Sequence, residues 1–345
     1  MKKFKVGVCG NFDTEIKSIN GQSQKTVNIA KQLILKYGEN NVFCVDTSNF
    51  KKNPIVFLFN YLKMLKLCQN IVLLPANNSI RIVVPLAVRL KKKYRYKILY
   101  PVIGAWLANM LNAKTKLREC AKQIDMIYPE SVTLKEELES IGIKNVKVMA
   151  NFKNIEPFLY DEINKEFNKP YNICFFSRVT PQKGVDDLIN AVKEINKNEI
   201  KYILDIYGPI YEPYKEEFLK CIEPPYINYK GVVEHDRGKY ILKDYYLHIF
   251  PTKYPGDGVP GSVVESYMAG LPVIASCWPS CRDVIDDNIT GLIYEFGNYK
   301  QLKEKLLEAY NEPEKMISMR ENCIKKAYDY TPECVMKKLY DDMEV

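Results

Sequence analysis

The sequence predicts an α/β fold made of two doubly wound domains, and three observations support this prediction. With 345 residues, of which 47% are hydrophobic, the chain is long enough for two cores, since a typical domain has about 100–200 residues. Short β-type runs alternate with longer segments of helical periodicity almost from end to end, which favours parallel sheets with helices on both faces. The alternation breaks only at residues 150–170, a polar stretch with a proline near each end that indicates a domain linker.

The first half of the chain predicts six strands and five helices. Its strands are short apolar runs, and its helices have apolar residues three or four positions apart. We expect strands at 4–9, 42–46, 71–74, 97–100, 124–127 and 146–149, and helices near 22–37, 54–67, 80–93, 105–121 and 131–141.

The second half repeats this alternation and ends in helices. We expect strands at 172–177, 201–207, 227–229, 246–251 and 271–276, and helices near 184–195, 212–221, 237–243, 260–270, 298–310, 313–328 and 332–343. The domains are therefore 1–152 and 171–329, with a linker at 153–170. Two doubly wound domains facing each other place the functional site in the cleft between them, outside the carboxyl ends of the strands.

The composition excludes several classes of protein. With 27% charged residues, 16 Gly and 19 Pro, the chain is typical of a globular protein rather than a disordered one. No segment approaches the ~18–20 uncharged apolar residues of a spanning helix, and the start lacks the apolar run of a secretory signal. The ten cysteines form no C-x-x-C pair, and with only His235 and His248 in the chain a zinc site around Cys277 and Cys281 is disfavoured. We expect a cytoplasmic protein without a metal site.

The charge is distributed unevenly along the chain. Residues 1–155 carry 26 Lys and Arg against 10 Asp and Glu, whereas residues 156–345 carry 24 against 32. Residues 47–118, called here the basic segment, contain 14 Lys and Arg and no acidic residue. Such a segment favours an anionic partner, either a membrane surface or nucleic acid, and an ordinary solvated face is the alternative. No nucleic-acid-binding motif accompanies the charge, which disfavours nucleic acid.

A connection rich in Gly and Pro is the most informative stretch of the second half. Residues 256–261 match the pattern G-x-G-x-x-G between a predicted strand and a predicted helix. Glycines there let a ligand approach backbone N–H groups at a helix N-terminus, which favours phosphate. Glu265 follows in the second helical turn, from which its carboxylate could reach ribose hydroxyls. A tight connection beside a solvated Glu is the alternative.

Two cations follow the first predicted strand of the second domain. Arg178 and Lys183 lie five residues apart in this loop, just before an amphipathic helix that starts at Gly184. Together they can clamp a diphosphate by bidentate and point-charge contacts. Surface cations that cap nearby elements are the alternative, which the presence of both motifs in one domain disfavours.

With these motifs in this order, the chain resembles the family 4 glycosyltransferases of the GT-B fold over nearly its whole length. The resemblance implies that Arg178 and Lys183 bind the donor diphosphate and that Glu265, the last residue of the family's E-x7-E element, holds the donor ribose. The first Glu of that element corresponds to Asp257, a shorter carboxylate that would face the donor sugar. Residues implied to line the sugar, the phosphates and the nucleobase are Gly258, Val259, Pro260, Gly261, Ser262 and, in segment 231–236, Val233.

The same resemblance implies roles for the first domain and for the end of the chain. Gly21, Gln22 and Lys25, in segment 19–33, would border the donor phosphate and the acceptor, and Gly104 would lie near the acceptor. The last helix, about residues 330–345, would pack back on the first domain.

The resemblance also implies a reaction. A retaining transferase would move a sugar from a nucleotide sugar, a UDP-sugar rather than a GDP-sugar, to a saccharide acceptor without a metal. Arg178 and Lys183 would stabilise the leaving diphosphate, while Asp257 and Glu265 position the donor. A lipid-linked acceptor, in polysaccharide or glycolipid assembly, would bring the basic segment to the inner face of the membrane. The alternatives are a non-catalytic sugar-nucleotide-binding or scaffolding protein and a GT-B epimerase or hydrolytic relative.

Overall fold

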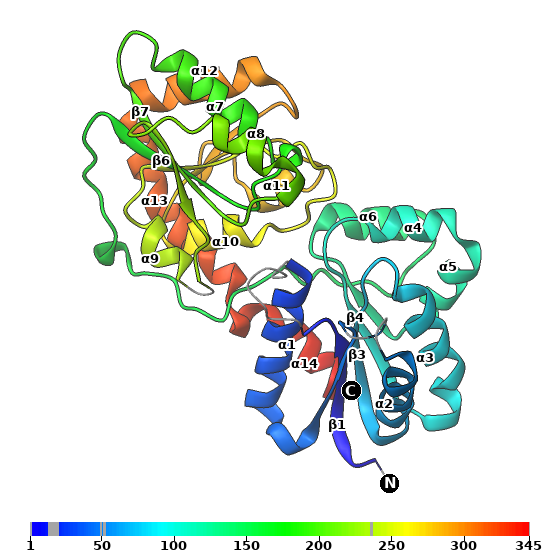
Figure 1. Ribbon diagram of the computed structural model, residues 1–345. Coiled ribbons are helices and arrows are strands. Elements are labelled where there is room, and N and C mark those ends of the chain that lie inside the picture. The colour runs from blue at the N-terminus through cyan, green and yellow to red at the C-terminus, as the bar shows by residue number, and fades with distance from the viewer. Residues whose placement is uncertain (1, 13–20, 49, 51–52, 235–236, 345) are drawn as a thin grey trace. The chain divides into compact units, whose positions relative to one another are not determined.

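The computed structural model describes residues 2–12, 21–48, 50, 53–234 and 237–344. The chain divides into two compact units, Met1–Phe152 with Pro332–Val345, and Lys153–Thr331. These units are called here the first and the second domain, and each is an α/β domain with one parallel sheet (Figure 1). The expected fold class, two Rossmann-like α/β domains, is therefore confirmed.

The first domain has a sheet of five parallel strands in the order β2-β1-β3-β4-β5. Its strands are nearly continuous apolar runs because helices cover both faces of the sheet. They are β1 (Phe4–Gly10), β2 (Val42–Asp46), β3 (Cys68–Leu74), β4 (Lys97–Pro101) and β5 (Met126–Tyr128).

The helices of the first domain form two layers. On one face of the sheet α1 (Gly21–Tyr37) and α14 (Pro332–Glu344) bury Ile29, Leu33, Met336 and Leu339 in one core. The other face is covered by α2 (Pro54–Leu67), α3 (Ile80–Tyr94), α4 (Leu107–Ala113), α5 (Thr115–Ala121) and α6 (Val132–Ser140). The last helix of the chain thus packs in the first domain.

The second domain has a sheet of six parallel strands in the order β11-β10-β9-β6-β7-β8. The strands are β6 (Tyr171–Phe176), β7 (Tyr202–Tyr207), β8 (Ile227–Gly231), β9 (Leu247–Phe250), β10 (Val273–Ser276) and β11 (Gly291–Tyr294).

Helices cover both faces of this sheet as well. One core contains side chains of α7 (Val185–Ile195), α8 (Lys215–Lys220), α12 (Tyr299–Asn311) and α13 (Pro313–Ala327). A smaller core lies under α9 (Gly238–Leu242) and the end of α10 (Gly261–Met268), where Leu242, Ala269 and Leu271 are buried. The short α11 (Cys281–Val284) follows β10.

The structure differs from the expected elements at several places, and the short α11 was among the elements not expected. Residues 146–149 form only an isolated bridge to β5 at Val146, because the chain leaves this sheet edge after a few hydrogen bonds. The expected helix at 105–121 is broken at Lys114, whose non-helical backbone (φ −131°, ψ 84°) separates α4 from α5. Strand β11 was not expected, since it is a four-residue run inside a segment rich in turn residues.

The strand order places a topological switch point in each sheet. In the second domain the chain runs from β6 outward to β8 and then returns to β9 on the other side of β6. In the first domain the corresponding neighbours are β1 and β3. Ligands of doubly wound sheets bind outside the carboxyl ends of the strands at such points. The loops after β6 and β9 are therefore the first place to search for a site.

Candidate functional site

The loop after β6 carries both predicted cations. Arg178 is exposed and forms no hydrogen bond or ion pair with any residue the structure describes, whereas Lys183 is 8% exposed. Gly184 follows with φ 72°, and a Cβ on it would lie 1.9 Å from the carbonyl oxygen of Pro251, at the end of β9. Only glycine allows this close approach, so Gly184 holds the β6 loop against the β9 loop.

The loop after β9 meets Lys183 through Asp257. The Lys183 ammonium lies 2.6 and 2.7 Å from the two Asp257 carboxylate oxygens. The Thr252 hydroxyl donates a further hydrogen bond of 2.7 Å to Oδ2 of Asp257. Lys183, predicted to bind the donor diphosphate, and Asp257, predicted to face the donor sugar, therefore lie in direct contact across the switch point.

The start of α10 presents backbone donors beside this ion pair. Gly258 and Val259 are buried, Pro260 precedes the first turn, and the Trp278 indole donates to the Gly258 carbonyl at 3.2 Å. The N–H groups of Gly261 and Ser262 donate to no backbone or side-chain acceptor among the described residues. Free N–H groups at the first turn of a helix favour an anion.

Glu265 lies one turn further along α10 and is held by a lysine that the sequence did not indicate. Its Oε1 accepts a hydrogen bond from the ammonium of Lys153, and the side chains are only 8% and 11% exposed. A Cβ on Gly238, at the start of α9, would lie 1.8 Å from Oε2 of Glu265. Lys153 therefore holds the carboxylate, and Gly238 leaves the space that its second oxygen occupies.

Burial shifts the pKa values of two basic groups around the switch point. It lowers the pKa of Lys183 below its usual value, with Arg178 lowering it further and Asp257 opposing the change. His248, on β9, is fully buried, and desolvation lowers its pKa to about 3. Its Nδ1 lies 2.8 Å from the Ser266 hydroxyl of α10. His248 is thus a neutral packing residue behind the loop rather than a proton donor.

The predicted nucleobase contact follows β8. Val233 is half-buried, two residues beyond the end of that strand. Residues 235 and 236 of segment 231–236 lie outside the described residues. The role of Val233 stays a prediction.

The predicted residues of the first domain gather around its own switch point. Gly21 begins α1 and is exposed, and the Gln22 amide donates to the carbonyl of Leu74 at the end of β3. Lys25 is fully buried and donates to Glu130 Oε1 and the Val102 carbonyl, both at 2.8 Å. Residues 19 and 20 of segment 19–33 lie outside the described residues.

Gly104 belongs to the same hydrogen-bonded group. Its N–H donates to Oε2 of Glu130 at 3.2 Å, and its φ is 73°. Burial lowers the pKa of Lys25, and Glu130 opposes this change. In this geometry the Lys25 ammonium is hydrogen-bonded to protein oxygens. It holds Glu130, which accepts the hydrogen bond from Gly104, and so orders the loop that carries Gly104.

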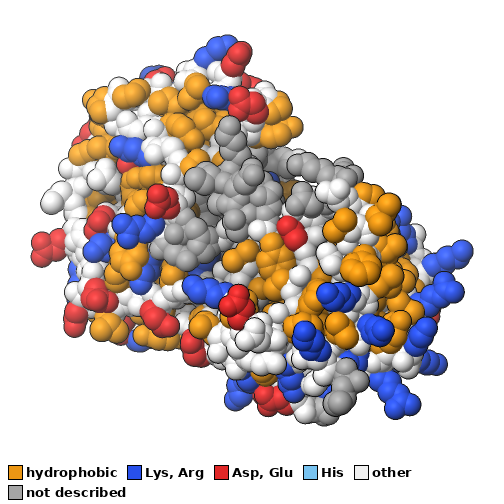
Figure 2. Space-filling view, turned by 60° about the horizontal axis from the view of Figure 1, so that its bottom comes forward, with side chains coloured by type: hydrophobic (Ala, Val, Ile, Leu, Met, Phe, Trp, Pro, Cys, Tyr) orange, Lys and Arg blue, Asp and Glu red, His pale blue; other side chains and the backbone are white. Residues whose placement is uncertain are grey.

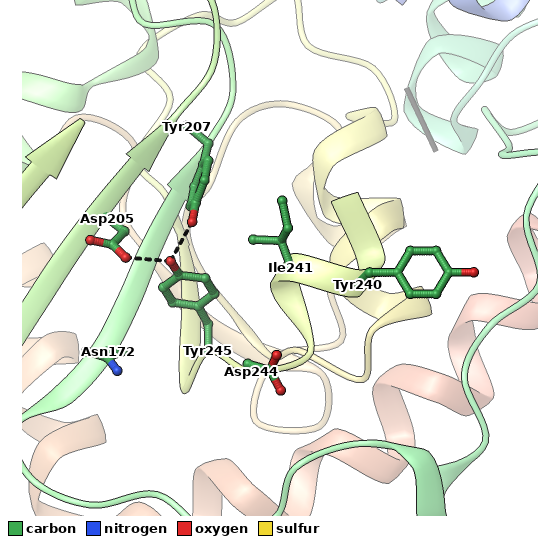
Figure 3. Close-up of a pocket in the computed structure, with 7 residues that line it drawn as sticks. All are labelled: Asn172, Asp205, Tyr207, Tyr240, Ile241, Asp244 and Tyr245. Carbon is green, nitrogen blue, oxygen red and sulfur yellow. Dashed lines mark hydrogen bonds between the residues drawn. The ribbon is translucent and has the colours of Figure 1, made fainter. Parts of the chain in front are cut away.

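A separate hollow of about 380 Å³ opens on the sheet of the second domain (Figure 3). The Tyr245 hydroxyl donates to Asp205 at 2.6 Å and lies 2.8 Å from the Tyr207 hydroxyl. Asn172 and Asp244 also line the hollow, and none of the predicted site residues does. It has two carboxylates and no cation among the described residues that line it, which makes it unsuited to a diphosphate.

The second domain matches a known family of enzymes. Residues 159–330 match the family described as glycosyl transferases group 1. The second domain therefore contains a glycosyltransferase group 1 domain.

Curated relatives with similar sequences are also named as glycosyltransferases. An uncharacterized glycosyltransferase of Methanocaldococcus jannaschii is 32% identical over 58% of this chain and 57% of that protein. A poly(ribitol-phosphate) alpha-N-acetylglucosaminyltransferase of Staphylococcus aureus is 26% identical over 67% of this chain and 43% of that protein. The chain thus spans about half the length of these curated relatives.

Solved structures share the fold over the whole chain. HepE of Anabaena, solved with UDP and glucose and also with UDP-glucose, has a TM-score of 0.74 at 14% identity and covers 99% of both chains. At this identity the likeness shows a shared fold.

Proposed function

We propose that this chain, which contains a glycosyltransferase group 1 domain, transfers a sugar from a UDP-sugar to a hydroxyl of a saccharide acceptor with retention of configuration. The observation that carries the proposal is the switch point between β6 and β9. There a lysine, free backbone N–H groups and a fixed carboxylate lie on adjoining loops of one domain. HepE of Anabaena, which shares the fold, was solved with UDP and with UDP-glucose, which supports a UDP-sugar donor.

The donor diphosphate would bind to the cations and to the start of α10. The Lys183 ammonium has three N–H donors, of which two suffice for Asp257 and the third is left for a phosphate oxygen. Arg178 is exposed in the same loop and adds a planar, bidentate donor. The N–H groups of Gly261 and Ser262 complete a cradle for negative charge.

The two carboxylates would position the donor rather than transfer protons. Asp257 and Glu265 are each held by a lysine, Lys183 and Lys153. Each carboxylate has further lone pairs, which can accept hydrogen bonds from the sugar and the ribose respectively. Since both are ion-paired acceptors, neither is set up as a nucleophile.

The chemical step then uses the leaving group as its base. The bond between the sugar C1 and the phosphate oxygen breaks, and its electron pair goes to the diphosphate. The acceptor oxygen forms the new bond to C1 on the same face, and its proton passes to the departing phosphate oxygen. Lys183, Arg178 and the α10 N–H groups stabilise the charge that develops on the diphosphate.

The acceptor is proposed to be a saccharide carried on a lipid, in polysaccharide or glycolipid assembly. The acceptor site would lie at the switch point of the first domain, lined by Gly21, Gln22 and Gly104. The buried Lys25–Glu130 pair would hold the Gly104 loop in place. The reaction is proposed to need no metal, so EDTA should leave the rate unchanged and added Mg²⁺ should not raise it.

A thermal-shift panel of UDP, GDP, ADP and their sugar conjugates tests the proposal. A ligand at 100 times its dissociation constant stabilises the protein by about 2.7 kcal/mol. We expect a shift with UDP and its conjugates that is lost in Glu265→Ala. No shift with any nucleotide would contradict the donor site, and binding without transfer to any acceptor would indicate a non-catalytic protein of the same fold.

A further inference from the structure

Helix α2 has two apolar faces, of which only one is buried. Phe57, Tyr61, Met64 and Leu65 pack in the core of the first domain and are at most 6% exposed. The other large apolar residues of the helix remain exposed to solvent. They are Ile55 at 83%, Val56 at 57%, Leu58 at 43%, Phe59 at 67% and Leu62 at 37%.

The exposed residues form one continuous stripe, called here the α2 apolar face. At about 100° per residue, Ile55, Val56, Leu58, Phe59 and Leu62 span roughly 160° of the helix circumference. No other helix among the described residues has more than one large hydrophobic residue this exposed. Scattered exposed apolar residues need no explanation, whereas a contiguous patch marks an interaction surface.

Basic side chains lie on the same side of α2 as this stripe and on the adjoining helix. Lys63 and Lys66, toward the C-terminal end of α2, are exposed on the side of the apolar face. The adjoining α3 adds exposed Arg81, Ile82 and Arg89, and the two helices are joined by a hydrogen bond of 2.7 Å from Tyr61 to the Val83 carbonyl. None of these four cations forms an ion pair with another residue that the structure describes. In Figure 2, Lys and Arg side chains are interspersed with hydrophobic ones over the first domain.

We infer that α2 is a membrane-docking helix, whose apolar face enters the interface of a bilayer that contains anionic lipids. A helix with an apolar stripe and neighbouring lysines lies in the plane of the headgroups, with its apolar side chains below them. The charge selects this occupant: a second copy of the chain would bring the same cations against one another. A bilayer with anionic headgroups satisfies the cations and buries the stripe together.

The geometry is that of a surface helix rather than a spanning one. The helix has 14 residues, and its other face is part of the domain core. None of the described helices is long and apolar enough to cross a membrane. Docking therefore requires no rearrangement of the domain, because the stripe is already exposed.

Vesicle co-sedimentation of the full chain tests the inference. Binding to vesicles of phosphatidylcholine is compared with binding to vesicles of phosphatidylcholine and phosphatidylglycerol at a ratio of about three to one. We expect binding to the anionic vesicles and a drop of roughly fivefold for each lysine removed in Lys63→Gln and Lys66→Gln. Raising the salt should weaken binding, because it screens the charges.

Variants that replace apolar residues of the α2 apolar face distinguish insertion into the bilayer from electrostatic attraction alone. Ile55→Ser with Phe59→Ser should lower the affinity for anionic vesicles by at least about tenfold, since two exposed side chains no longer leave water. Leu219→Ser with Leu307→Ser is the matched control, because both residues are exposed on helices of the second domain. It should bind as the unaltered chain does. All these residues are exposed, so the melting temperature should be retained.

A probe inside the stripe reports its depth. In Phe59→Trp, lipids brominated on their acyl chains should quench the added fluorescence on binding, beyond any quenching of Trp106 and Trp278 in the unaltered chain. The inference is overturned by three results: no binding to anionic vesicles at low salt, equal binding of the Ile55→Ser/Phe59→Ser variant, or a dimer that this variant abolishes. Transfer to a soluble acceptor is measured separately, so failure of docking and failure of the proposed activity are distinguishable.

Discussion

The ion pair between Lys153 and Glu265 makes the most specific prediction for the second domain. Its two side chains are 11% and 8% exposed, so the Lys153→Met variant leaves a carboxylate buried without its cation. Removal of one partner from a buried pair costs about 3–5 kcal/mol, and the slight exposure of both groups places this pair near 3 kcal/mol. Urea unfolding followed by circular dichroism measures the change.

The control is the exposed pair between Lys165 and Asp161. These side chains are 37% and 96% exposed, so Lys165→Met should change the free energy of unfolding by less than about 0.5 kcal/mol. The double variant Lys153→Met/Glu265→Gln removes the charge together with its partner. It should be less destabilised than the sum of its single variants.

The same single and double variants show whether Lys153 acts on nucleotide binding through Glu265. The affinity for UDP, measured by calorimetry, should fall in Lys153→Met and in Glu265→Gln. Lys153→Met should cause no further loss of affinity in a chain that already carries Glu265→Gln. The reasoning is refuted if Lys153→Met destabilises the protein no more than Lys165→Met, or if its effect on UDP affinity adds fully to that of Glu265→Gln.

Three further predictions concern the same domain. Lys183→Ala should lower the turnover number by roughly 10²–10³-fold. Lys193→Ala, which breaks an exposed pair with Glu223, should leave the rate unchanged. Equal rates for the two variants would contradict the role of Lys183. Gly238→Ala should lose nucleotide binding, because its Cβ would displace the Glu265 carboxylate, and normal UDP affinity in that variant would refute this geometry. His248 has a pKa of about 3 in the folded protein against an ordinary value of 6.5, so the unfolded state binds a proton first and stability falls as the pH drops from 6.5 towards 3. Relative to His248→Gln, the unaltered protein should lose roughly 3 kcal/mol between pH 6.5 and 4; parallel pH profiles would show that His248 is not buried in this way.

The fold could be predicted because both domains rest on periodic patterns. Buried parallel strands are continuous apolar runs, and the helices between them have regular apolar spacing, so their order is visible without tertiary information. The expected strands were wrong where the length of an apolar run or its tertiary context decides whether a strand forms. β11 is four residues long, and residues 146–149 bond to the sheet edge without extending it.

The candidate site could be predicted only where a local pattern surrounds its residues. Lys183 and Asp257 lie in loops next to glycines, between a strand and a helix, and the structure brings their charged groups into contact. Lys153 lies in an irregular segment with no pattern around it and reaches Glu265 only through the fold. The pairing of Lys25 with Glu130 likewise joins residues 105 positions apart. Such partners become visible only when the sheet order is known.

Hydrogen exchange of the full chain with and without UDP tests the central claim most directly. The claim is that the loops after β6 and β9 form a site for a nucleoside diphosphate. UDP should slow exchange at Arg178–Gly184 and at Asp257–Ser262, because a bound diphosphate would shield both loops and the free N–H groups of Gly261 and Ser262 would gain phosphate acceptors. Protection confined to the hollow at Tyr240–Tyr245, or no protection in the second domain at saturating UDP, would contradict it.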